Sequence, residues 1–137
     1  GAEDKKISVV FQEDRLCENI NAVKNVMLVA SEGMDKSKAV SLLTGLGLSD
    51  SLNKPVSKLS GCMKRRVAIA RALIEKADIY LFDEPLKGLD YEIKSEVIEL
   101  IMERTAGAIT LIVTHDKTDI SAFGATVVSL PSYQGQA

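Results

Sequence analysis

Two short apolar runs separated by a helical stretch constrain the fold of this chain more than any other feature. Residues 79–82 read Ile-Tyr-Leu-Phe and residues 109–113 read Ile-Thr-Leu-Ile-Val. A continuous apolar run of this length is typical of a strand covered on both faces. Between the runs, residues 91–104 have the apolar spacing of an amphipathic helix. This alternation predicts an α/β fold with a parallel sheet flanked by helices.

Four further elements fit the same alternation. They are a short strand over residues 8–11, a clear amphipathic helix over 61–76, a short helix near 117–122 and a last strand over 126–130. The stretch between the first strand and the clear helix does not fit it, because two helices, over 19–30 and 36–46, follow one another there. Asp35 is placed to cap the second of them.

These patterns divide the chain into two parts. We expect residues 1–15 and 59–137 to belong to one sheet core, which is incomplete at its N-terminal side. We expect residues 16–58 to form an α-helical subdomain on one side of the sheet, next to the start of the helix at residue 61.

Composition narrows the class of protein. The chain has 137 residues, enough for one core, and only 4% of them are aromatic, so the core must be aliphatic. The net charge of -2 argues against non-specific binding to nucleic acid. Cys17 and Cys62 form no CxxC pair and no cluster with histidine, which argues against zinc. No apolar run approaches the roughly 20 residues that span a bilayer.

Two acidic residues follow the first apolar run directly. Because ligands bind beyond the carboxyl ends of strands in an open parallel sheet, Asp83 and Glu84 are predicted to lie at the functional edge. Asp83 is suited to hold Mg²⁺ and Glu84 to polarise an attacking water. The alternative is a simple helix-capping pair, against which Pro85 argues.

Two more polar residues end apolar strands. His115, the only histidine, follows the run at 109–113 and is predicted to contact a charged ligand at the same edge, rather than to be an ordinary satisfied side chain. Gln12 follows the strand at 8–11, and its amide can accept from metal-bound water or donate to phosphate. Alone, Gln12 would be a weak signal.

Ser60 and Gly61 precede the clear helix. A helix N-terminus presents free N–H groups and partial positive charge, which favour an anion, and simple N-capping by Ser60 is compatible with that role. The basic run Lys64-Arg65-Arg66 is interpreted as a solvated helix face rather than as a nucleic-acid patch.

Taken together, these residues resemble the ATP-binding-cassette (ABC) ATPase family. Five stretches carry the resemblance in the family's order: Val10-Phe11-Gln12 for the Q-loop, Leu59-Ser60-Gly61-Cys62-Met63 for the signature, residues 79–84 for Walker B, Gly88-Leu89-Asp90 for the D-loop and Thr114-His115-Asp116 for the switch histidine. Each stretch is weak alone, whereas the ordered set is highly specific.

The resemblance implies a P-loop NTPase-like fold and an ATPase that powers an ABC transporter. It implies that Asp83 and Gln12 serve Mg²⁺, and that Glu84, His115 and Gln12 act on the ATP phosphate and the attacking water. In the family two cassettes close head to tail, so Ser60, Gly61, Cys62 and Asp90 would serve the nucleotide of a second ABC ATPase subunit. The subdomain at 16–58 would meet transmembrane permease subunits at the cytoplasmic face of the membrane. A bacterial importer is the preferred type.

The chain departs from the family pattern at two places. Cys62 stands where the signature usually has glycine, and its small side chain is expected to reduce the fit of phosphate rather than to block it. We interpret Cys62 as a tolerated small residue; a more reactive thiol at this helix start is the alternative. The phosphate loop G-x-x-x-x-G-K-[ST] is absent from the sequence. We interpret the chain as the C-terminal part of a cassette domain, with a natural split or degenerate ATPase as the alternative.

Two rival functions remain. One is a non-transport ABC protein of the translation or DNA-repair type, and the short insert between Gln12 and Ser60 argues against the DNA-repair type. The other is an interaction module without activity. For the isolated chain we predict weak or no ATP binding, no measurable ATPase activity, and self-association through an exposed edge and an uncovered face of the sheet.

Overall fold

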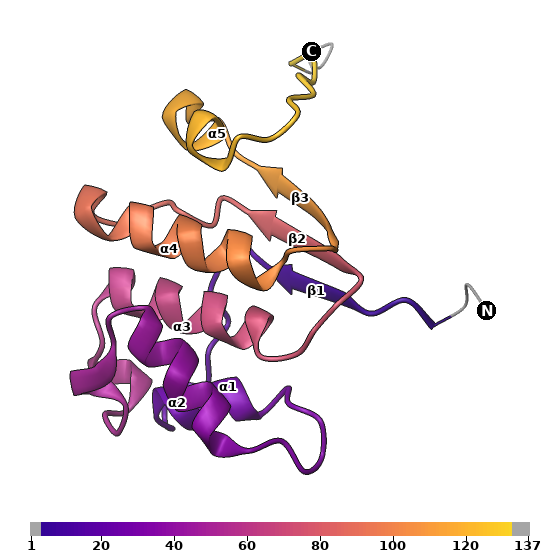
Figure 1. The fold of residues 1–137 in the computed structure, drawn as a ribbon. Coiled ribbons are helices and arrows are strands. Elements are labelled where there is room, and N and C mark those ends of the chain that lie inside the picture. The colour runs from indigo at the N-terminus through magenta and orange to yellow at the C-terminus, as the bar shows by residue number, and fades with distance from the viewer. Residues whose placement is uncertain (1–3, 133–137) are drawn as a thin grey trace, which may run out of the picture.

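The computed structural model describes residues 4–132 and contains one parallel sheet of three strands (Figure 1). The strands are β1 (Ile7–Val10), β2 (Ile79–Asp83) and β3 (Ile109–Val113), and they lie in the order β1-β2-β3. Val10 is aligned with Phe82, and Phe82 with Ile112. The predicted parallel α/β sheet flanked by helices is therefore confirmed.

Helices connect the strands in both crossovers. Between β1 and β2 the chain forms α1 (Ala22–Met27), α2 (Lys36–Gly45), two short 3-10 turns (Ser49–Ser51 and Val56–Lys58) and α3 (Gly61–Leu73). Between β2 and β3 it forms α4 (Tyr91–Arg104), and α5 (Lys117–Phe123) follows β3. Among residues 4–132, no helix combines the length and the apolar character needed to cross a bilayer.

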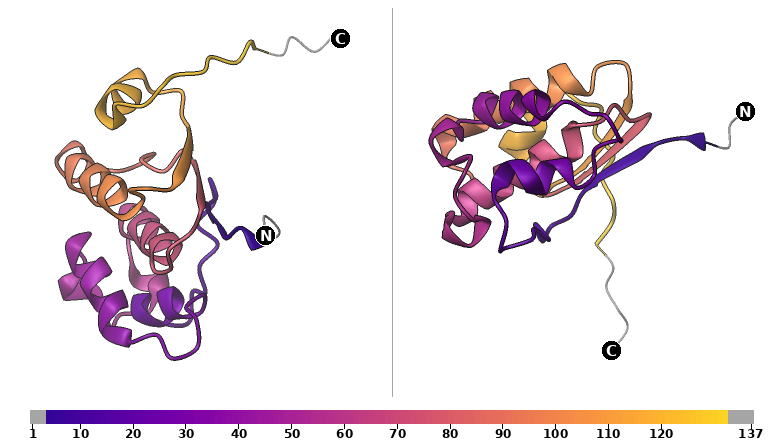
Figure 2. Two further views of the ribbon diagram at one scale, coloured as in Figure 1. Left: turned by 45° about the vertical axis from the view of Figure 1, so that its right-hand side comes forward. Right: turned by 90° about the horizontal axis from the view of Figure 1, so that it is seen from below.

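The helices cover only one face of the sheet, as the left view of Figure 2 shows. On the covered face, Val10, Tyr80 and Phe82 are almost wholly buried. On the opposite face, Ile109, Leu111 and Val113 are 56–62% exposed, and Ile7 and Val9 lie beside them in register across β2. The expectation that the strand at 79–82 is covered on both faces is therefore wrong within the described residues, whereas the predicted uncovered face is present.

The core lies between the sheet and α3. Val67, Ile69 and Ala70 of α3 are fully buried, and α1 and α2 pack on the same helix. The hydroxyl of Ser8 donates to the carbonyl of Ala72 at 2.6 Å, which fixes β1 against α3. Each fully buried aliphatic side chain stabilises the fold by about 1.5–3 kcal/mol, so the apolar packing of α3 against the sheet is the main source of stability. The proposed division of the chain into a sheet core (residues 1–15 and 59–137) and a helical subdomain (residues 16–58) stays a prediction. Residues 1–3 and 133–137 of the proposed sheet core lie outside the described part.

Capping side chains set the helix boundaries. The α1 helix begins later than the predicted residue 19, because the Asn21 side chain caps it by accepting from the Lys24 N–H at 2.8 Å. Asp35 caps α2 as predicted, and the hydrogen bond from the Ser37 backbone N–H lowers the pKa of its carboxyl. After α2, Gly47 has φ of +77°, a conformation that favours glycine.

The predicted last strand at residues 126–130 is wrong. No strand forms there, and Thr126, Val127 and Val128 instead lie beside Ile112 and Phe123. A β-strand needs a neighbouring strand to bond its backbone, and none of the described strands pairs with this segment. The apolar pattern of residues 126–130 is therefore not sufficient to predict a strand.

Asn25 is the most deeply buried polar side chain of the helical region. Its Oδ1 accepts from the Cys17 N–H at 2.8 Å, and its Nδ2 donates to the carbonyls of Cys17, Ile20 and Asn21. These bonds fix the turn that leads into α1.

We predict that Asn25→Ala lowers the free energy of unfolding by about 1–3 kcal/mol, because it leaves buried backbone groups without partners. Chemical denaturation measures the change. Asn19→Ala, at an exposed position of the same turn, is the control and should change the stability little. Equal stability of the two variants would contradict the role of Asn25.

The uncovered sheet face supports the prediction of self-association, which stays a prediction. We expect light scattering to give a mass above that of one chain, and Leu111→Lys, at the middle of the edge strand β3 on this face, to lower it. Leu130→Lys, which is 85% exposed but lies off the sheet, is the control. A monomeric mass for the unchanged chain would contradict the prediction.

Candidate functional site

The carboxyl ends of the three strands lie side by side at one edge of the sheet. Gln12 follows β1, Asp83 and Glu84 lie at the end of β2, and His115 follows β3. Because the strands are parallel and adjacent in the order β1-β2-β3, their polar ends meet at this edge. We call this group of residues, Gln12, Asp83, Glu84 and His115, the polar edge.

Glu84 and His115 are in direct contact within the polar edge. The Nδ1 atom of His115 lies 2.5 Å from Oε1 of Glu84. The Glu84 side chain is 13% exposed, whereas that of His115 is 82% exposed, so the histidine faces solvent over a mostly buried carboxylate. The backbone N–H of Glu84 donates to the carbonyl of Val113 at 2.8 Å, which joins the end of β2 to the end of β3.

Glu84 has an unusual backbone conformation. Its φ is +49°, in the left-handed region that costs energy for any residue with a side chain. Such strain persists only where the surroundings hold the residue, and it often marks functional sites. Here it turns the chain sharply at the end of β2, directly before Pro85.

The connection that carries His115 is anchored by its neighbours in sequence. Asp116 donates its backbone N–H to Oγ1 of Thr114 at 3.1 Å, and its side chain caps α5 by accepting from the N–H groups of Thr118 and Asp119. The hydrogen bond from the Thr118 hydroxyl is the main cause that lowers the pKa of the Asp116 carboxyl. His115 therefore lies on a short connection anchored between β3 and α5.

Asp83 is the last residue of β2 and directly precedes Glu84. It is half-buried, and among residues 4–132 its carboxylate makes no hydrogen bond and no ion pair. No group of three or more His, Cys, Asp or Glu side chains in the described part could hold a metal ion. This donor set fits Mg²⁺, which commonly takes one or two carboxylates and fills its remaining positions with water and substrate phosphate. The exposed Gln12 side chain has no recorded contact with Asp83.

The predicted partner-facing residues make no hydrogen bond or ion pair with Glu84 or His115 within the described residues. Ser60 caps α3 by accepting from the Met63 N–H at 3.2 Å, and a side-chain carbon added at Gly61 would meet nothing within 4 Å. Asp90 precedes α4 with an exposed carboxylate. No recorded contact within the described part joins Ser60, Gly61 or Asp90 to the polar edge. Their predicted role at a second nucleotide stays a prediction.

Cys62 is half-buried and packs against the hydrophobic core. The neighbouring Lys64 points elsewhere, because its Nζ lies 3.1 Å from the Glu18 carboxylate. Of the two interpretations of Cys62, this surrounding favours a small residue tolerated in packing over a reactive thiol.

The interpretation of Lys64-Arg65-Arg66 as a solvated face is wrong for two of its three residues. Arg65 is 4% exposed and Arg66 is 6% exposed. Arg66 donates to the carbonyls of Leu46 and Cys62, so it ties the end of α2 to α3. The sequence carried one signal of this burial: Arg65 shares a helical face with Ala68, Ile69 and Ala72, all of them buried.

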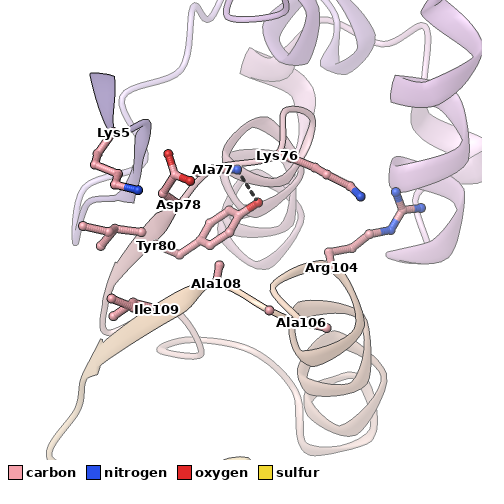
Figure 3. Close-up of a pocket in the computed structure, with 11 residues that line it drawn as sticks. Lys5, Lys76, Ala77, Asp78, Tyr80, Arg104, Ala106, Ala108 and Ile109 are labelled. Carbon is pink, nitrogen blue, oxygen red and sulfur yellow. Dashed lines mark hydrogen bonds between the residues drawn. The ribbon is translucent and has the colours of Figure 1, made fainter. Parts of the chain in front are cut away.

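A hollow of about 530 Å³ lies at the opposite, amino ends of the strands (Figure 3). Its lining includes Lys5, Lys76, Asp78 and Arg104 around Tyr80. The Tyr80 hydroxyl is already engaged, accepting from the Ala77 N–H at 3.0 Å and donating to the Glu75 carbonyl. This hollow is remote from the polar edge, which remains the candidate functional site.

A parallel sheet with acidic and amide side chains beyond its strand ends is typical of α/β proteins that act on nucleotide phosphates. Comparison with known families gives the particular class. The protein-family model described as "ABC transporter" matches residues 2–87, more than half of the sequence. The chain therefore belongs to this family. The resemblance stated from the sequence is confirmed.

Individual relatives agree with this assignment. The L-cystine import ATP-binding protein TcyN of Bacillus subtilis is 40% identical over 119 residues, which are 82% of this chain and 46% of the relative. The lipoprotein-releasing system ATP-binding protein LolD 1 of Caulobacter vibrioides is 38% identical over 121 residues, 82% of this chain and 52% of the relative. The chain thus spans about half the length of these relatives.

A solved structure supports the fold. The ATP-binding cassette MJ0796, described as a dimeric post-hydrolysis state bound to ADP and Pi, matches with a TM-score of 0.75 and 29% identity. The match covers 86% of this chain and 56% of MJ0796. The predicted P-loop NTPase-like fold is therefore confirmed.

The surroundings of the two cysteines predict different reactivity. With Ellman's reagent, we expect Cys62 to react roughly tenfold more slowly than the exposed Cys17, because Cys62 is half-buried and packs against the core. Cys17→Ser and Cys62→Ser isolate the two thiols, and the unfolded variants serve as controls with similar rates. A Cys17→Ser variant that reacts as fast as Cys62→Ser would contradict this interpretation.

Proposed function

We propose that this chain is the part of an ABC transporter's ATP-binding subunit that carries the signature and the hydrolytic residues. The observation that carries the proposal is the contact of Glu84 with His115 at the carboxyl edge of the sheet. The adjacent Asp83 carboxylate makes no hydrogen bond or ion pair within residues 4–132. Membership of the ABC transporter family and the names of the relatives as ATP-binding proteins support it.

The polar edge would divide the chemistry among its residues. Asp83 would hold Mg²⁺, which supplies positive charge against the ATP phosphates. Oε1 of Glu84 contacts Nδ1 of His115. Oε2 of Glu84 makes no hydrogen bond or ion pair within the described part, so this oxygen is available to accept a proton from water. The exposed His115 ring would then engage the terminal phosphate, and Gln12 would contact the metal or the water.

The start of α3 would act on a second copy of the cassette. Ser60, Gly61 and Cys62 present the free N–H end of a helix to solvent, and open space at Gly61 allows close approach of a phosphate. With Asp90, they would contact nucleotide held by the partner in a head-to-tail dimer. MJ0796 is described as dimeric, which supports this assembly.

The proposed setting is the cytoplasmic face of the membrane, with the helical residues 16–58 against permease subunits. The relatives' names include both cystine import and lipoprotein release. The proposal therefore specifies an ATP-binding subunit and leaves out the direction of transport.

We predict that the 137-residue chain alone shows no measurable ATPase activity, because its sequence has no phosphate loop to hold the ATP phosphates. A coupled assay of phosphate release with Mg²⁺ and ATP measures this. Turnover by the isolated chain that disappears in Glu84→Gln would contradict the prediction.

A hybrid protein tests the proposed function. In this hybrid, the TcyN segment that precedes the matched region is joined to residues 4–137. We expect ATP hydrolysis, and we expect Glu84→Gln to lower kcat by about 10²–10⁴-fold with ATP binding retained, since it removes the group that takes the proton from water. Glu92→Gln, an exposed carboxylate at the start of α4, is the control.

Nucleotide binding, measured separately by fluorescence of an ATP analogue, separates failure of the hybrid to fold from failure of the proposal. A hybrid that binds ATP and hydrolyses it equally well with Glu84→Gln would overturn the assignment of Glu84.

A further inference from the structure

Arg65 connects two of the three strand ends that form the polar edge. From the buried middle of α3, its Nη1 donates to the carbonyls of Phe11 (2.6 Å) and Gln12 (3.2 Å) and to Oδ1 of Asp14 (2.9 Å). Its Nη2 donates to the carbonyls of Asp83 (2.8 Å) and Glu84 (2.6 Å), and its Nε to that of Pro85 (3.3 Å). One side chain therefore holds both the loop after β1 and the turn after β2.

A second arginine of α3 holds the far end of the first loop. Arg71 donates from Nη2 to the carbonyl of Asp14 at 2.6 Å and from Nη1 to the carbonyl of Arg15 at 2.8 Å. The guanidinium of Arg15 in turn lies 4.3 Å from the centre of the Phe11 ring. The segment 11–15 is thus attached to α3 at both ends.

The backbone strain of the described residues coincides with these contacts. Arg15 and Glu84 are the only residues other than glycine within 4–132 that have positive φ, at 51° and 49°. The carbonyl of Glu84 is held by Arg65 and that of Arg15 by Arg71. Strained backbone persists only where other interactions outweigh its cost, and charge-assisted hydrogen bonds are the strong kind.

We propose that Arg65 is a positioning residue for Glu84 and Gln12, and that it keeps Glu84 in the left-handed conformation from which its carboxylate meets His115. The catalytic meaning of this role rests on the proposed function. The geometry requires arginine, because only a planar guanidinium offers five N–H donors in a fixed fork. Lysine offers three donors at one point and cannot reach both loops at once.

The role can be tested in the chain itself, without nucleotide. In Arg65→Lys we expect the Glu84 amide, which donates to the Val113 carbonyl, to exchange with solvent about tenfold faster relative to the amides of Val67 and Ile69. We also expect the ¹⁵N shift of His115 Nδ1 to move toward its value in Glu84→Gln. NMR measures both.

Arg66→Lys is the matched control. Arg66 is equally buried and lies next in sequence, but it bonds to the carbonyls of Leu46 and Cys62 and not to the strand ends. It should speed exchange of the core amides without a selective change at Glu84 or His115. Equal changes at the core and the polar edge in both variants would overturn the proposal and leave Arg65 a structural residue.

A milder variant covers the case in which Arg65→Lys does not fold. Asp14→Asn removes the carboxylate charge that pairs with Arg65, the only such pair of Arg65 within residues 4–132, at a partly exposed position. It should move the Glu84 exchange rate and the His115 shift in the same direction by a smaller amount, and no selective change would overturn the proposal.

In the hybrid protein, Arg65→Lys should then lower kcat with little change in ATP affinity. An unchanged kcat together with selectively faster exchange of the Glu84 amide would overturn the catalytic importance of this positioning, but not the positioning itself. A selective change at Glu84 and His115 in a hybrid without ATPase activity would support the positioning and contradict the proposed function, so the two failures are distinguishable.

Discussion

The arrangement of the polar edge depends on one buried guanidinium. Burying a charge costs several kcal/mol unless hydrogen bonds replace the lost water, and Arg65 meets this condition with six oxygen atoms around its five N–H groups. Five of these oxygens are backbone carbonyls of two separate loops. The positions of the loops are therefore linked to the position of α3, and through α3 to the core.

This link gives a physical reason for the location of the candidate site. Parallel strands bring Gln12, Glu84 and His115 to one edge, but loops at strand ends are otherwise free to move. Arg65 and Arg71 fix the loops from one side, and the Glu84–His115 contact and the Glu84 N–H bond to Val113 fix them from the other. Asp83, the last residue of β2, lies between these restraints.

Much of this arrangement could be predicted from the sequence because strand patterns and strand ends are local signals. The apolar runs at 79–82 and 109–113 predicted β2 and β3, and the polar residues after them predicted the edge where Glu84 and His115 meet. The strand expected at 126–130 failed because strand formation depends on a partner that the local pattern does not reveal. The burial of Arg65 and Arg66 was missed for a similar reason: charge predicts exposure unless distant carbonyls compensate for it, and those come from residues up to 54 positions away.

We propose that the polar edge presents Glu84 to the terminal phosphate of ATP, with Asp83 at the metal. A crystal structure of the Glu84→Gln hybrid with Mg²⁺ and ATP tests it most directly. The account predicts the metal within coordination distance of Asp83, directly or through one water, and the side chain at position 84 next to the water that faces the terminal phosphate. Nucleotide bound away from the strand ends, or a metal held without Asp83, would contradict it.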